Sequence, residues 1–598
     1  MFKLLKELFN LLTPSQRRRF YALQILVTLM AIVEIFGVAS IIPFMAIVGD
    51  MSQLQQDTFI AKVYQSSGIT SESQFVFLLG ICVLTVLFFS SIISMITIWR
   101  LSMFAHKIGT EIADRLYTHY LKQDWLFHAS GSSAQLTKKI ATESLRVTGA
   151  VLVPLVHVNA KIILAVLLSI SIFVYDPTVA IIGLSIFAFT YFVLFRGVRM
   201  RLAKYGEAVS DVNERRFRLM NEGFGGIKDV LLLGRDNDFI KRFNNTGNIL
   251  AHSQGTSTAL IQAPRYLMEL IAFGSMIALV LYLIVSHNGN LGMILPILSV
   301  YAIGSIKLLP AFQQIYSSVA VIRANIAAFE SIQSDLNNSF KTNPSIQKID
   351  QSYLNPNKSI CIENVTFSYP NKEEPALNNL NMLIPVNSVI GIVGPSGSGK
   401  STLIDILLCL IKPQQGQLKV DEITINDQNR RSWQNTIGFV AQSIFLSEGT
   451  IAENVAFGIP KHEIDFDQVK KVLALAHLND LIETLEKGVH TRVGERGIQL
   501  SGGQRQRIGI ARALYHKAEV LVFDEATSSL DGITEKMIME AIHEFSGKKS
   551  IILIAHRLKT VQKCDQIFFI DKGKVVDHGT YKELIKKNEH FRDMAIHA

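Results

Sequence analysis

Six apolar segments in the first 320 residues constrain the fold more than any other feature of this sequence. Each is about 20 residues or longer, which lets a helix cross roughly 30 Å of hydrocarbon. They lie at Tyr21–Val48, Phe75–Trp99, Gly149–Tyr175, Thr178–Val198, Tyr266–Ser286 and Leu291–Phe312. One such segment alone would fit a buried helix of a soluble protein. Six together predict a membrane domain of six transmembrane helices.

The composition agrees with a chain that is partly membrane-embedded and partly soluble. Hydrophobic residues make up 49% of the 598 positions and charged residues only 18%, whereas charged residues reach about 25% in ordinary soluble proteins. A chain of this length also exceeds one compact core, so at least two domains are expected. The four cysteines lie far apart without a CxxC motif, which indicates neither a metal site nor a disulfide framework.

Lysine and arginine predict the orientation in the membrane. Lys62 is the only lysine or arginine in the loop between the first two spans, whereas the long loops at 100–147 and 196–265 are strongly basic. Because cytoplasmic loops carry the excess of positive charge, both termini and both long loops are expected in the cytoplasm. The net charge of +9 is therefore assigned to contact with membrane lipids, and no nucleic acid is expected as a partner.

Each long loop is interrupted near its middle. The interruptions read DWLFHASGSS at 124–133 and EGFGGIKDVLLLG at 222–234. Glycine and serine at these places allow sharp turns around a short transverse helix. The two segments are either simple loop tips or docking elements for a soluble domain.

The character of the chain changes past residue 330, where a polar stretch is typical of a linker. Strand and helix patterns then alternate, with strands near Ile360–Ser368, at Val389–Val393 and at Val520–Phe523, and a helix from Lys400. We therefore predict a helical membrane domain over 1–325, a linker over 326–357 and an α/β domain of the P-loop NTPase class over 358–598.

The sequence GPSGSGKST follows an apolar strand and leads into an apolar helix, which is the context required of a phosphate-binding loop. Its glycines let backbone N–H groups point at phosphate oxygens, and Lys400 is expected to bridge the β- and γ-phosphates. Ser401 is expected to bind Mg²⁺ through its hydroxyl group. The candidate nucleotide-binding residues of this loop are Gly394, Pro395, Ser396, Gly397, Ser398, Gly399, Lys400, Ser401 and Thr402.

A second element of the nucleotide site is LVFDE at 521–525, a predicted buried strand that ends in two carboxylates. Asp524 is placed to hold Mg²⁺, and Glu525 to orient and deprotonate the attacking water. Apolar strands that end in acidic residues are common, so this motif alone is weak. Together with the phosphate-binding loop it predicts an NTPase.

The sequence LSGGQ at 500–504 opens a further predicted helix, so Ser501, Gly502 and Gly503 offer backbone N–H groups to an anion. An ordinary Ser-Gly-Gly helix start would read the same way. The phosphate-binding loop surrounds its own nucleotide from one side only. The opposite face of the γ-phosphate is therefore left for a second molecule.

Residues 360–590 resemble the nucleotide-binding domain of ATP-binding cassette (ABC) transporters, with each short motif in order. The resemblance implies that Tyr369 stacks on the adenine of ATP, and that Gln442 senses Mg²⁺ and touches the membrane domain. It also implies that the LSGGQ segment, through Gln504, closes on ATP held by a second copy. Asp531 matches the D-loop of the family, and His556 matches the histidine that contacts the γ-phosphate.

Six spans fused ahead of one such domain resemble an export half-transporter that works as a homodimer with ATP and Mg²⁺ at two composite sites. The breaks at 124–133 and 222–234 match the coupling helices of this family, and TRVGERG at 491–497 matches a loop that contacts them. The resemblance thus implies an ATPase coupled to transport, with its nucleotide-binding domain in the cytoplasm.

The segments at 34–50 and 263–274 look like those of bacterial flippases for lipid-linked oligosaccharides. That resemblance implies a polyprenyl-pyrophosphate-linked glycan as substrate, moved across the bacterial inner membrane. Arg265 and Lys307 stand where the family places positive charge, and Glu34 is a further ionisable residue at membrane depth. The second span is uncharged near Phe88, where another cation is expected.

Three alternatives to the oligosaccharide lipid stay open. An exporter of lipid A-like lipids or hydrophobic drugs would share the ATPase but have a different cavity. A peptide exporter is disfavoured because no protease-like region and no cysteine precede Cys82. A membrane-anchored sensor NTPase is disfavoured by the coupling-type loops.

Overall fold

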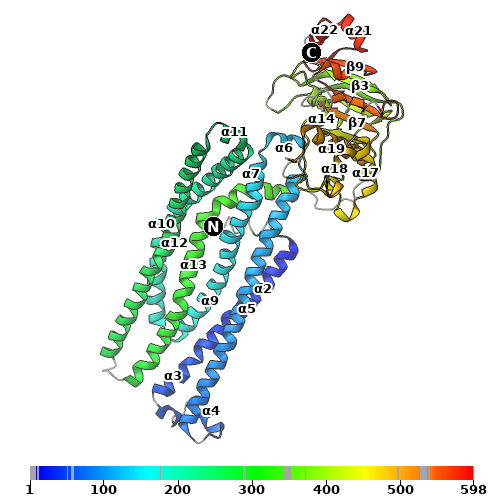
Figure 1. The fold of residues 1–598 in the computed structure, drawn as a ribbon. Coiled ribbons are helices and arrows are strands. Elements are labelled where there is room, and N and C mark those ends of the chain that lie inside the picture. Colours follow the sequence, from blue (N-terminus) through cyan, green and yellow to red (C-terminus); the bar gives the residue numbers. More distant parts are fainter. Residues whose placement is uncertain are drawn as a thin grey trace. The chain divides into compact units, whose positions relative to one another are not determined.

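The computed structural model describes the chain in two compact units (Figure 1). The first unit is Met1–Gln123 with Phe127–Pro344, and the second is Asp124–Leu126 with Ser345–Ala598. The described residues are 9, 12–49, 51–55, 59–69, 71–175, 177–286, 291–340, 352–370, 372–494, 497, 499–525, 535–536, 539–540, 542, 544–555 and 557–596.

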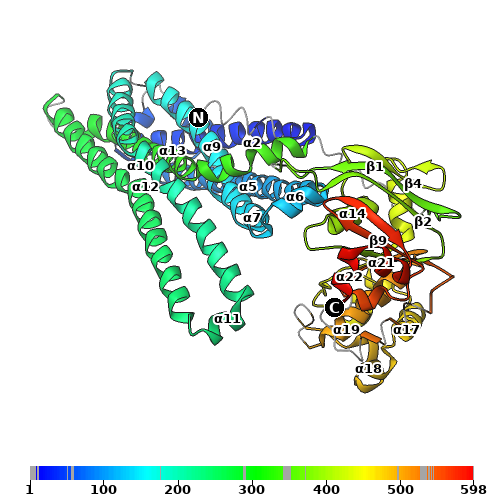
Figure 2. The same cartoon turned by 90° about the horizontal axis from the view of Figure 1, so that it is seen from above.

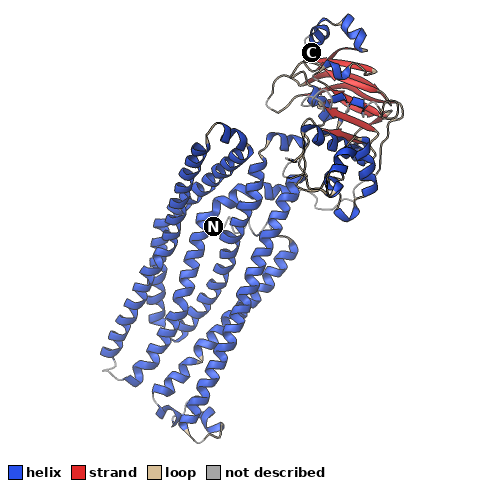
Figure 3. Ribbon diagram, in the orientation of Figure 1, coloured by secondary structure: helices blue, strands red, loops and turns tan. Residues whose placement is uncertain are grey.

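The first unit is helical throughout its described part (Figure 3). Its long helices are α2 (Pro14–Ala39), α5 (Glu72–Leu121), α9 (Val153–Tyr175), α10 (Pro177–Gly225), α12 (Asp236–Ser286) and α13 (Leu291–Ser339). The short elements are α3 (Ile41–Gly49), η1 (Met51–Gln55), α4 (Phe59–Ser66), α7 (Ser133–Lys138), η2 (Lys139–Glu143), α8 (Ser144–Val147), η3 (Thr148–Leu152) and α11 (Ile227–Leu232). The helix α6 (Trp125–Ser130) is divided, with Trp125 and Leu126 in the second unit and the rest in the first.

All six predicted spans lie within helices. The first begins soon after a capping box, in which the Thr13 side chain accepts from the backbone of Gln16 and the Gln16 side chain accepts in return. Among the described residues, four helical stretches are long and apolar enough to cross a membrane: Pro14–Gly49, Glu72–Leu121, Ser133–Val174 and Asp236–Tyr282. The other two predicted spans lie in α10 and α13, where many side chains fall outside the described ones.

Large apolar side chains cover the outside of these helices. Ile25, Leu84 and Phe273 are 74%, 67% and 68% exposed. Apolar exposure on this scale is unfavourable in water, because soluble proteins keep contiguous apolar patches small. It suits a surface that contacts lipid.

Short helices occupy both predicted interruptions. α6 lies within 124–133, and α11 lies within 222–234 and follows Gly225 and Gly226. α13 continues to Ser339, so the first part of the predicted linker is helical, and the two units divide between Pro344 and Ser345.

The second unit contains two sheets, visible at the right of Figure 2. Its strands are β1 (Ser359–Phe367), β2 (Leu377–Pro385), β3 (Val389–Val393), β4 (Gln415–Val420), β5 (Ile423–Thr424), β6 (Ile437–Val440), β7 (Val520–Asp524), β8 (Ser550–Ile554), β9 (Gln566–Asp571) and β10 (Lys574–Gly579). A four-stranded sheet has the order β2-β1-β4-β5, and a six-stranded sheet the order β10-β9-β3-β8-β7-β6. In the six-stranded sheet only β10 pairs antiparallel.

Helices pack around these sheets. They are α14 (Lys400–Leu407), α15 (Arg430–Thr436), α16 (Ile451–Val455), α17 (Phe466–Leu475), α18 (Asn479–Thr484), α19 (Gly502–Tyr515), α21 (Tyr581–Lys587) and α22 (Glu589–Ile596). Successive residues of β3 serve opposite faces: Val389 and Val393 join one apolar core, and Ile390 and Ile392 join the other. A parallel strand buried on both faces needs such a continuous apolar run, which explains why VIGIV was recognisable in the sequence.

Trp433 is the largest fully buried side chain of this unit, and its indole N–H donates to the carbonyl oxygen of Leu407 at 2.8 Å. We expect Trp433→Ala to lower the free energy of unfolding by about 3–5 kcal/mol, because it leaves a large cavity and an unpaired carbonyl. Denaturant unfolding of the purified protein measures the change. Leu383→Ala, at a side chain that is 55% exposed, is the control and should change it by less than about 0.5 kcal/mol. Equal effects of the two substitutions would contradict this assignment of the core.

Candidate active site

The phosphate-binding loop, Gly394–Thr402, connects the end of β3 to α14. The strand β7, which carries Asp524 at its end, runs parallel to β3 with β8 between them. Both strands therefore deliver their following residues to the same edge of the sheet, where ligands of open α/β sheets bind. This placement explains how motifs more than a hundred residues apart contribute to one site.

Glycine is required in the loop for steric reasons. Gly397 and Gly399 have φ values of +79° and +104°, in the left-handed region that residues with a Cβ rarely adopt. A Cβ at Gly399 would lie 2.5 Å from the carbonyl oxygen of Ala376, and one at Gly394 would collide with that of Ile570. The loop therefore packs closely against the backbone at Ala376 and Ile570, and a side chain at Gly399 or Gly394 would prevent that packing.

Lys400 and Ser398 are two buried polar residues of this loop. The Nζ atom of Lys400 donates to the carbonyl oxygens of Gly394 and Pro395, both at 2.8 Å. Burial lowers the pKa of Lys400, while the charges of Glu525 and Asp524 act to raise it. The Oγ atom of Ser398 is buried and accepts or donates no hydrogen bond among the described residues. An anion with several oxygens, such as a polyphosphate, would satisfy that hydroxyl and the ammonium group.

Gln442 and Glu525 meet although 83 residues separate them. The Nε2 atom of Gln442 donates to Oε2 of Glu525 at 2.6 Å. Glu525 has a φ of 48°, in the left-handed region, and its backbone N–H donates to the carbonyl oxygen of Ile554 at 3.1 Å. Such a conformation costs of the order of 1 kcal/mol and persists where the surroundings hold it. The carboxylate is thereby fixed just past the end of β7.

Tyr369 lies next to the loop. Its hydroxyl is 3.1 Å from Oγ1 of Thr402, and its ring packs edge-on against Phe367 with centroids 5.1 Å apart. The structure therefore brings the predicted adenine-stacking residue to the phosphate-binding loop, with its orientation supported by a neighbouring ring.

The LSGGQ segment forms the beginning of α19. The Oγ atom of Ser501 accepts from the backbone N–H of Gln504 at 3.2 Å, and the Gln504 side chain accepts from the Ser501 N–H at 2.8 Å. This capping box fixes the N-terminus of α19, where Gly502 and Gly503 are the first two helical residues. No hydrogen bond or ion pair described for Ser501–Gln504 reaches the chain's own phosphate-binding loop.

His556 and Asp531 lie outside the described residues, as do Glu495 and Arg496 of the 491–497 loop. The roles implied for them remain predictions.

One half-buried carboxylate close to this site was not predicted from the sequence. Asp405 lies on α14, and burial raises its pKa to about 6; a hydrogen bond from Trp125 lowers it in part, and the charge of Asp524 raises it further. An acidic residue inside the apolar stretch TLIDILLCLI was the signal available in the sequence, because a carboxylate among apolar residues is costly unless it is paired or protonated.

This raised pKa gives the stability a pH dependence of known sign. The folded state favours the protonated Asp405, so its stabilising contribution is present below the usual pKa of aspartate and is lost as pH rises through about 6. We expect the stability of Asp405→Asn relative to the unsubstituted protein to increase between pH 4.5 and 7.5. Unfolding midpoints at both pH values measure it. Asp427→Asn replaces a carboxylate that is 78% exposed, and its difference in unfolding midpoint from the unsubstituted protein should be the same at both pH values. The same constant difference for Asp405→Asn would refute the prediction.

The candidate substrate residues of the membrane half are not joined by any contact among the described residues. Glu34 accepts a hydrogen bond from Oγ of Ser94 at 2.8 Å, which links α2 to α5. Arg265 pairs with Glu269 one turn away on α12, with Nε and Oε1 2.7 Å apart, and its side chain is 63% exposed. Lys307, on α13, is half-buried.

Comparisons with known proteins agree with both halves. Residues 377–528 match the family model described as ABC transporter, and residues 39–306 match the one described as ABC transporter transmembrane region. An ATP-dependent lipid A-core flippase of Cupriavidus pinatubonensis is 30% identical over 469 residues, which cover 74% of this chain and 77% of that protein. One from Shewanella denitrificans is 28% identical over 572 residues, covering 93% of this chain and 91% of that protein.

A solved structure of a bacterial Atm1-family ABC exporter with ATP bound has a TM-score of 0.77 to this chain. The match covers 97% of this chain and 98% of that one at 20% identity. At this identity the likeness concerns the fold alone: a helical membrane domain of the export type and an α/β nucleotide-binding domain.

Proposed function

Because this chain belongs to the ABC transporters, as an export half-transporter and ATPase coupled to transport, we propose that it flips a polyprenyl-pyrophosphate-linked glycan across the bacterial inner membrane. The hydrogen bond between Gln442 and Glu525 beside the phosphate-binding loop carries the catalytic part of this proposal. The part of the proposal that concerns the substrate rests on cationic side chains within apolar helices. Both termini and the nucleotide-binding domain lie in the cytoplasm in this proposal, as the basic loops favour.

ATP binds at the phosphate-binding loop in the proposed mechanism. Lys400 and the loop N–H groups hold the β- and γ-phosphates, while Tyr369 stacks on the adenine. Ser401, Gln442 and Asp524 would hold Mg²⁺, which neutralises charge on the phosphates when it is bound. The fit of the site to a phosphate group is supported by the Ser398 hydroxyl, which is buried and has no hydrogen-bond partner among the described residues.

Hydrolysis follows from the position of Glu525. Its carboxylate accepts a proton from the attacking water as the oxygen bonds to the γ-phosphorus and the bond to the β-phosphate oxygen breaks. Gln442 orients the carboxylate through its side-chain amide. His556 contacts the γ-phosphate in this proposal, by its match to the family.

A second copy of the chain completes each site. Half-transporters of this family dimerise, and we propose a homodimer because no motif in this sequence departs from the family pattern. The N–H groups of Gly502 and Gly503, held at the helix start by the Ser501–Gln504 capping box, then face the γ-phosphate held by the partner subunit, near the D-loop around Asp531. α11 supports a docking role, since Leu231, Leu232 and Leu233 are 66%, 84% and 68% exposed.

We expect Glu525→Gln to lower ATP turnover by about 10²–10⁴-fold with ATP binding kept, because the amide cannot accept the proton of the attacking water. Phosphate release and binding of a fluorescent ATP analogue measure the two effects. Glu463→Gln replaces a carboxylate of the same domain that is 61% exposed and should leave both unchanged. Turnover of the Glu525 variant within threefold of the unsubstituted protein would remove Glu525 from its proposed role.

Charged residues inside apolar helices support a substrate with an anionic head group. Arg265 and Lys307 lie on α12 and α13, and Glu34 lies on α2. Ionisable residues at membrane depth are costly and usually face a water-filled path or a partner. A pyrophosphate group would bind such cations strongly and with a defined orientation.

A lipid A-like lipid is the second candidate. It is favoured by the relatives, which are described as lipid A-core flippases and match up to 93% of this chain. Both candidate lipids present phosphate to the cations, so only their lipid and sugar parts separate them. A hydrophobic drug without phosphate, or an ATPase indifferent to lipid, remains as an outcome of the test.

The test is ATP-dependent flipping in proteoliposomes of two fluorescent probes, a polyprenyl-pyrophosphate-linked oligosaccharide and a lipid A analogue. We expect Lys307→Gln to reduce flipping of the pyrophosphate probe at least tenfold with basal ATP hydrolysis kept, because the head group loses a cation contact. Lys62→Gln, in the loop outside the spans, is the control and should flip normally. Movement of the lipid A analogue alone would transfer the proposal to the second candidate. Movement of neither, with ATP hydrolysed, would reject both.

A further inference from the structure

Among the described residues, the helices of the first unit form three apolar clusters, two of which involve α13. The largest one, which we call the body core, includes Leu116 of α5, Val147 of α8 and Phe329 of α13, all with exposures of 0%. Among the described residues, none of its members comes from α10 or α12. Those two helices join α13 in a smaller cluster, in which the buried residues are Leu202, Tyr316, Ala320 and Ala324. Among the described residues, the α10–α12 hairpin thus shares fewer buried apolar side chains with α13 than the body core contains.

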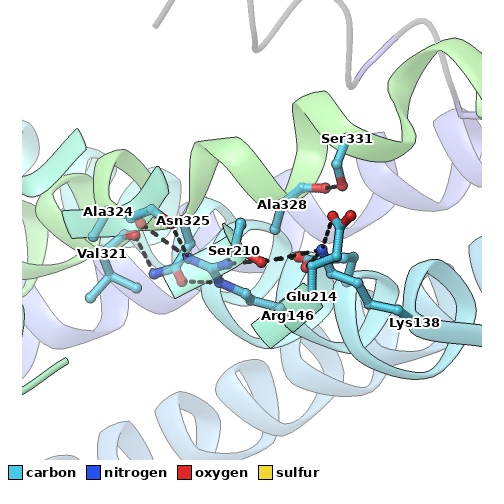
Figure 4. A network of polar contacts seen from close by, with 11 residues as sticks. Lys138, Arg146, Ser210, Glu214, Val321, Ala324, Asn325, Ala328 and Ser331 are labelled. Carbon is cyan, nitrogen blue, oxygen red and sulfur yellow. Dashed lines mark hydrogen bonds and ion pairs between the residues drawn. The ribbon is translucent and has the colours of Figure 1, made fainter. Parts of the chain in front are cut away.

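A polar network lies at the same junction, centred on Arg146 of α8 (Figure 4). Its Nε donates to Oδ1 of Asn325 and its Nη1 to Oγ of Ser210, both at 2.7 Å. Its Nη2 lies 3.2 Å from the carbonyl oxygen of Gly206 and 3.4 Å from that of Ala324. One guanidinium group thus binds α10 and α13 together from α8.

The helices α10 and α13 approach each other closely where Arg146 binds. A Cβ at Gly206 would collide with the carbonyl oxygen of Ala324. Because Gly206 has none, the two backbones come near enough for one planar guanidinium to reach the carbonyl groups of both.

Lys138 and Glu143 extend the network. Nζ of Lys138 donates to the carbonyl oxygen of Ser210 at 3.2 Å and to Oε2 of Glu214 at 3.3 Å. Glu143 is fully buried, with its carboxylate 3.5 Å from Lys138 Nζ and 3.7 Å from Arg146 Nη1. Neither of its oxygens accepts a hydrogen bond among the described residues. The carboxylate compensates two cations, but its oxygens lack the hydrogen bonds that usually offset the burial of a charge.

The opposite side of this segment is attached to the body. Nζ of Lys139 binds Oδ2 of Asp335 at 2.8 Å, and the hydroxyl of Tyr120 binds the same oxygen at 2.6 Å. Lys138 and Lys139 are adjacent, yet one binds α10 and the other α13. The π-helical turns η2 and η3 flank α8, and such turns are frequent at functional positions in helices.

We propose that Lys138, Glu143 and Arg146 form a latch between the α10–α12 hairpin and the body, and that the latch opens and closes during the transport cycle. The inference rests on the proposed function, since the cycle supplies the two states. Opening exchanges polar contacts for water, which is far less costly than exposing an apolar core. It also hydrates the Glu143 carboxylate. These three residues are positioning residues, because they act through the helices rather than on ATP.

The test measures the separation of α10 from α13 in the full-length protein in lipid vesicles. Spin labels are attached to cysteines introduced by Asp211→Cys and Glu330→Cys, at two exposed positions, in a protein whose native cysteines have been replaced. Pulsed electron paramagnetic resonance then reports the distribution of distances between the two labels. We expect two populations whose ratio changes when ATP is trapped with vanadate. Arg146→Gln should raise the longer-distance population of the nucleotide-free protein about tenfold, and Ser210→Ala should raise it less.

Arg218→Gln is the matched control, an arginine of α10 that is 65% exposed and pairs with Glu214 at 3.6 Å. It should leave the distribution unchanged. A merely structural Arg146 would lower the unfolding temperature without altering the two populations, and that result would overturn the latch. One unchanged distribution in every nucleotide state would overturn it as well. If the distances respond to ATP but neither lipid probe moves, the latch stands and the proposed substrate fails.

Discussion

Hydrocarbon around the membrane half imposes the constraint on which the rest of the structure depends. No water is available there to bind backbone N–H and carbonyl groups, so each apolar segment must satisfy them internally as a helix. The helices α5, α10, α12 and α13 are 50, 49, 51 and 49 residues long. At 1.5 Å per residue such a helix measures about 75 Å, more than twice the thickness of the hydrocarbon. Much of each helix must therefore find partners outside the lipid.

Those helical extensions explain why polar contacts hold the cytoplasmic part together. Within lipid, packing relies on apolar surface, and charges are rare. Beyond it, Arg146, Lys138 and Lys139 bind across α10 and α13 at positions where the spans alone would give no specificity. A junction made from such contacts can separate and re-form, whereas the body core, with residues such as Phe329 fully buried, is costly to open. The same chain thus combines a stable bundle with a hairpin that polar groups hold in place.

The residues of the nucleotide site are positioned in a different way, by the backbone geometry at the ends of parallel strands. Motif residues lie within a few positions of the ends of strands that continuous apolar runs made recognisable; the predicted strand at Val389–Val393 is the observed β3. Two features escaped sequence reasoning. The end of α13 was assigned to the linker on its polar composition, although Phe329, Ile332 and Leu336 recur at helical spacing and are fully buried. The burial of Asp405 depends on what packs against α14, which no local pattern specifies.

The sequence by itself determined the fold class, the six apolar spans, the interruptions that became α6 and α11, and the phosphate-binding loop. These features depend on neighbours along the chain, through hydrophobic periodicity and the φ values that glycine permits. The tertiary structure alone decided that Gln442 meets Glu525, 83 residues away, and that Arg146 meets Asn325, 179 residues away. Such pairs form only when distant elements pack. The chemistry of a side chain determines which groups it can bind, but tertiary packing determines which groups lie close enough to be bound.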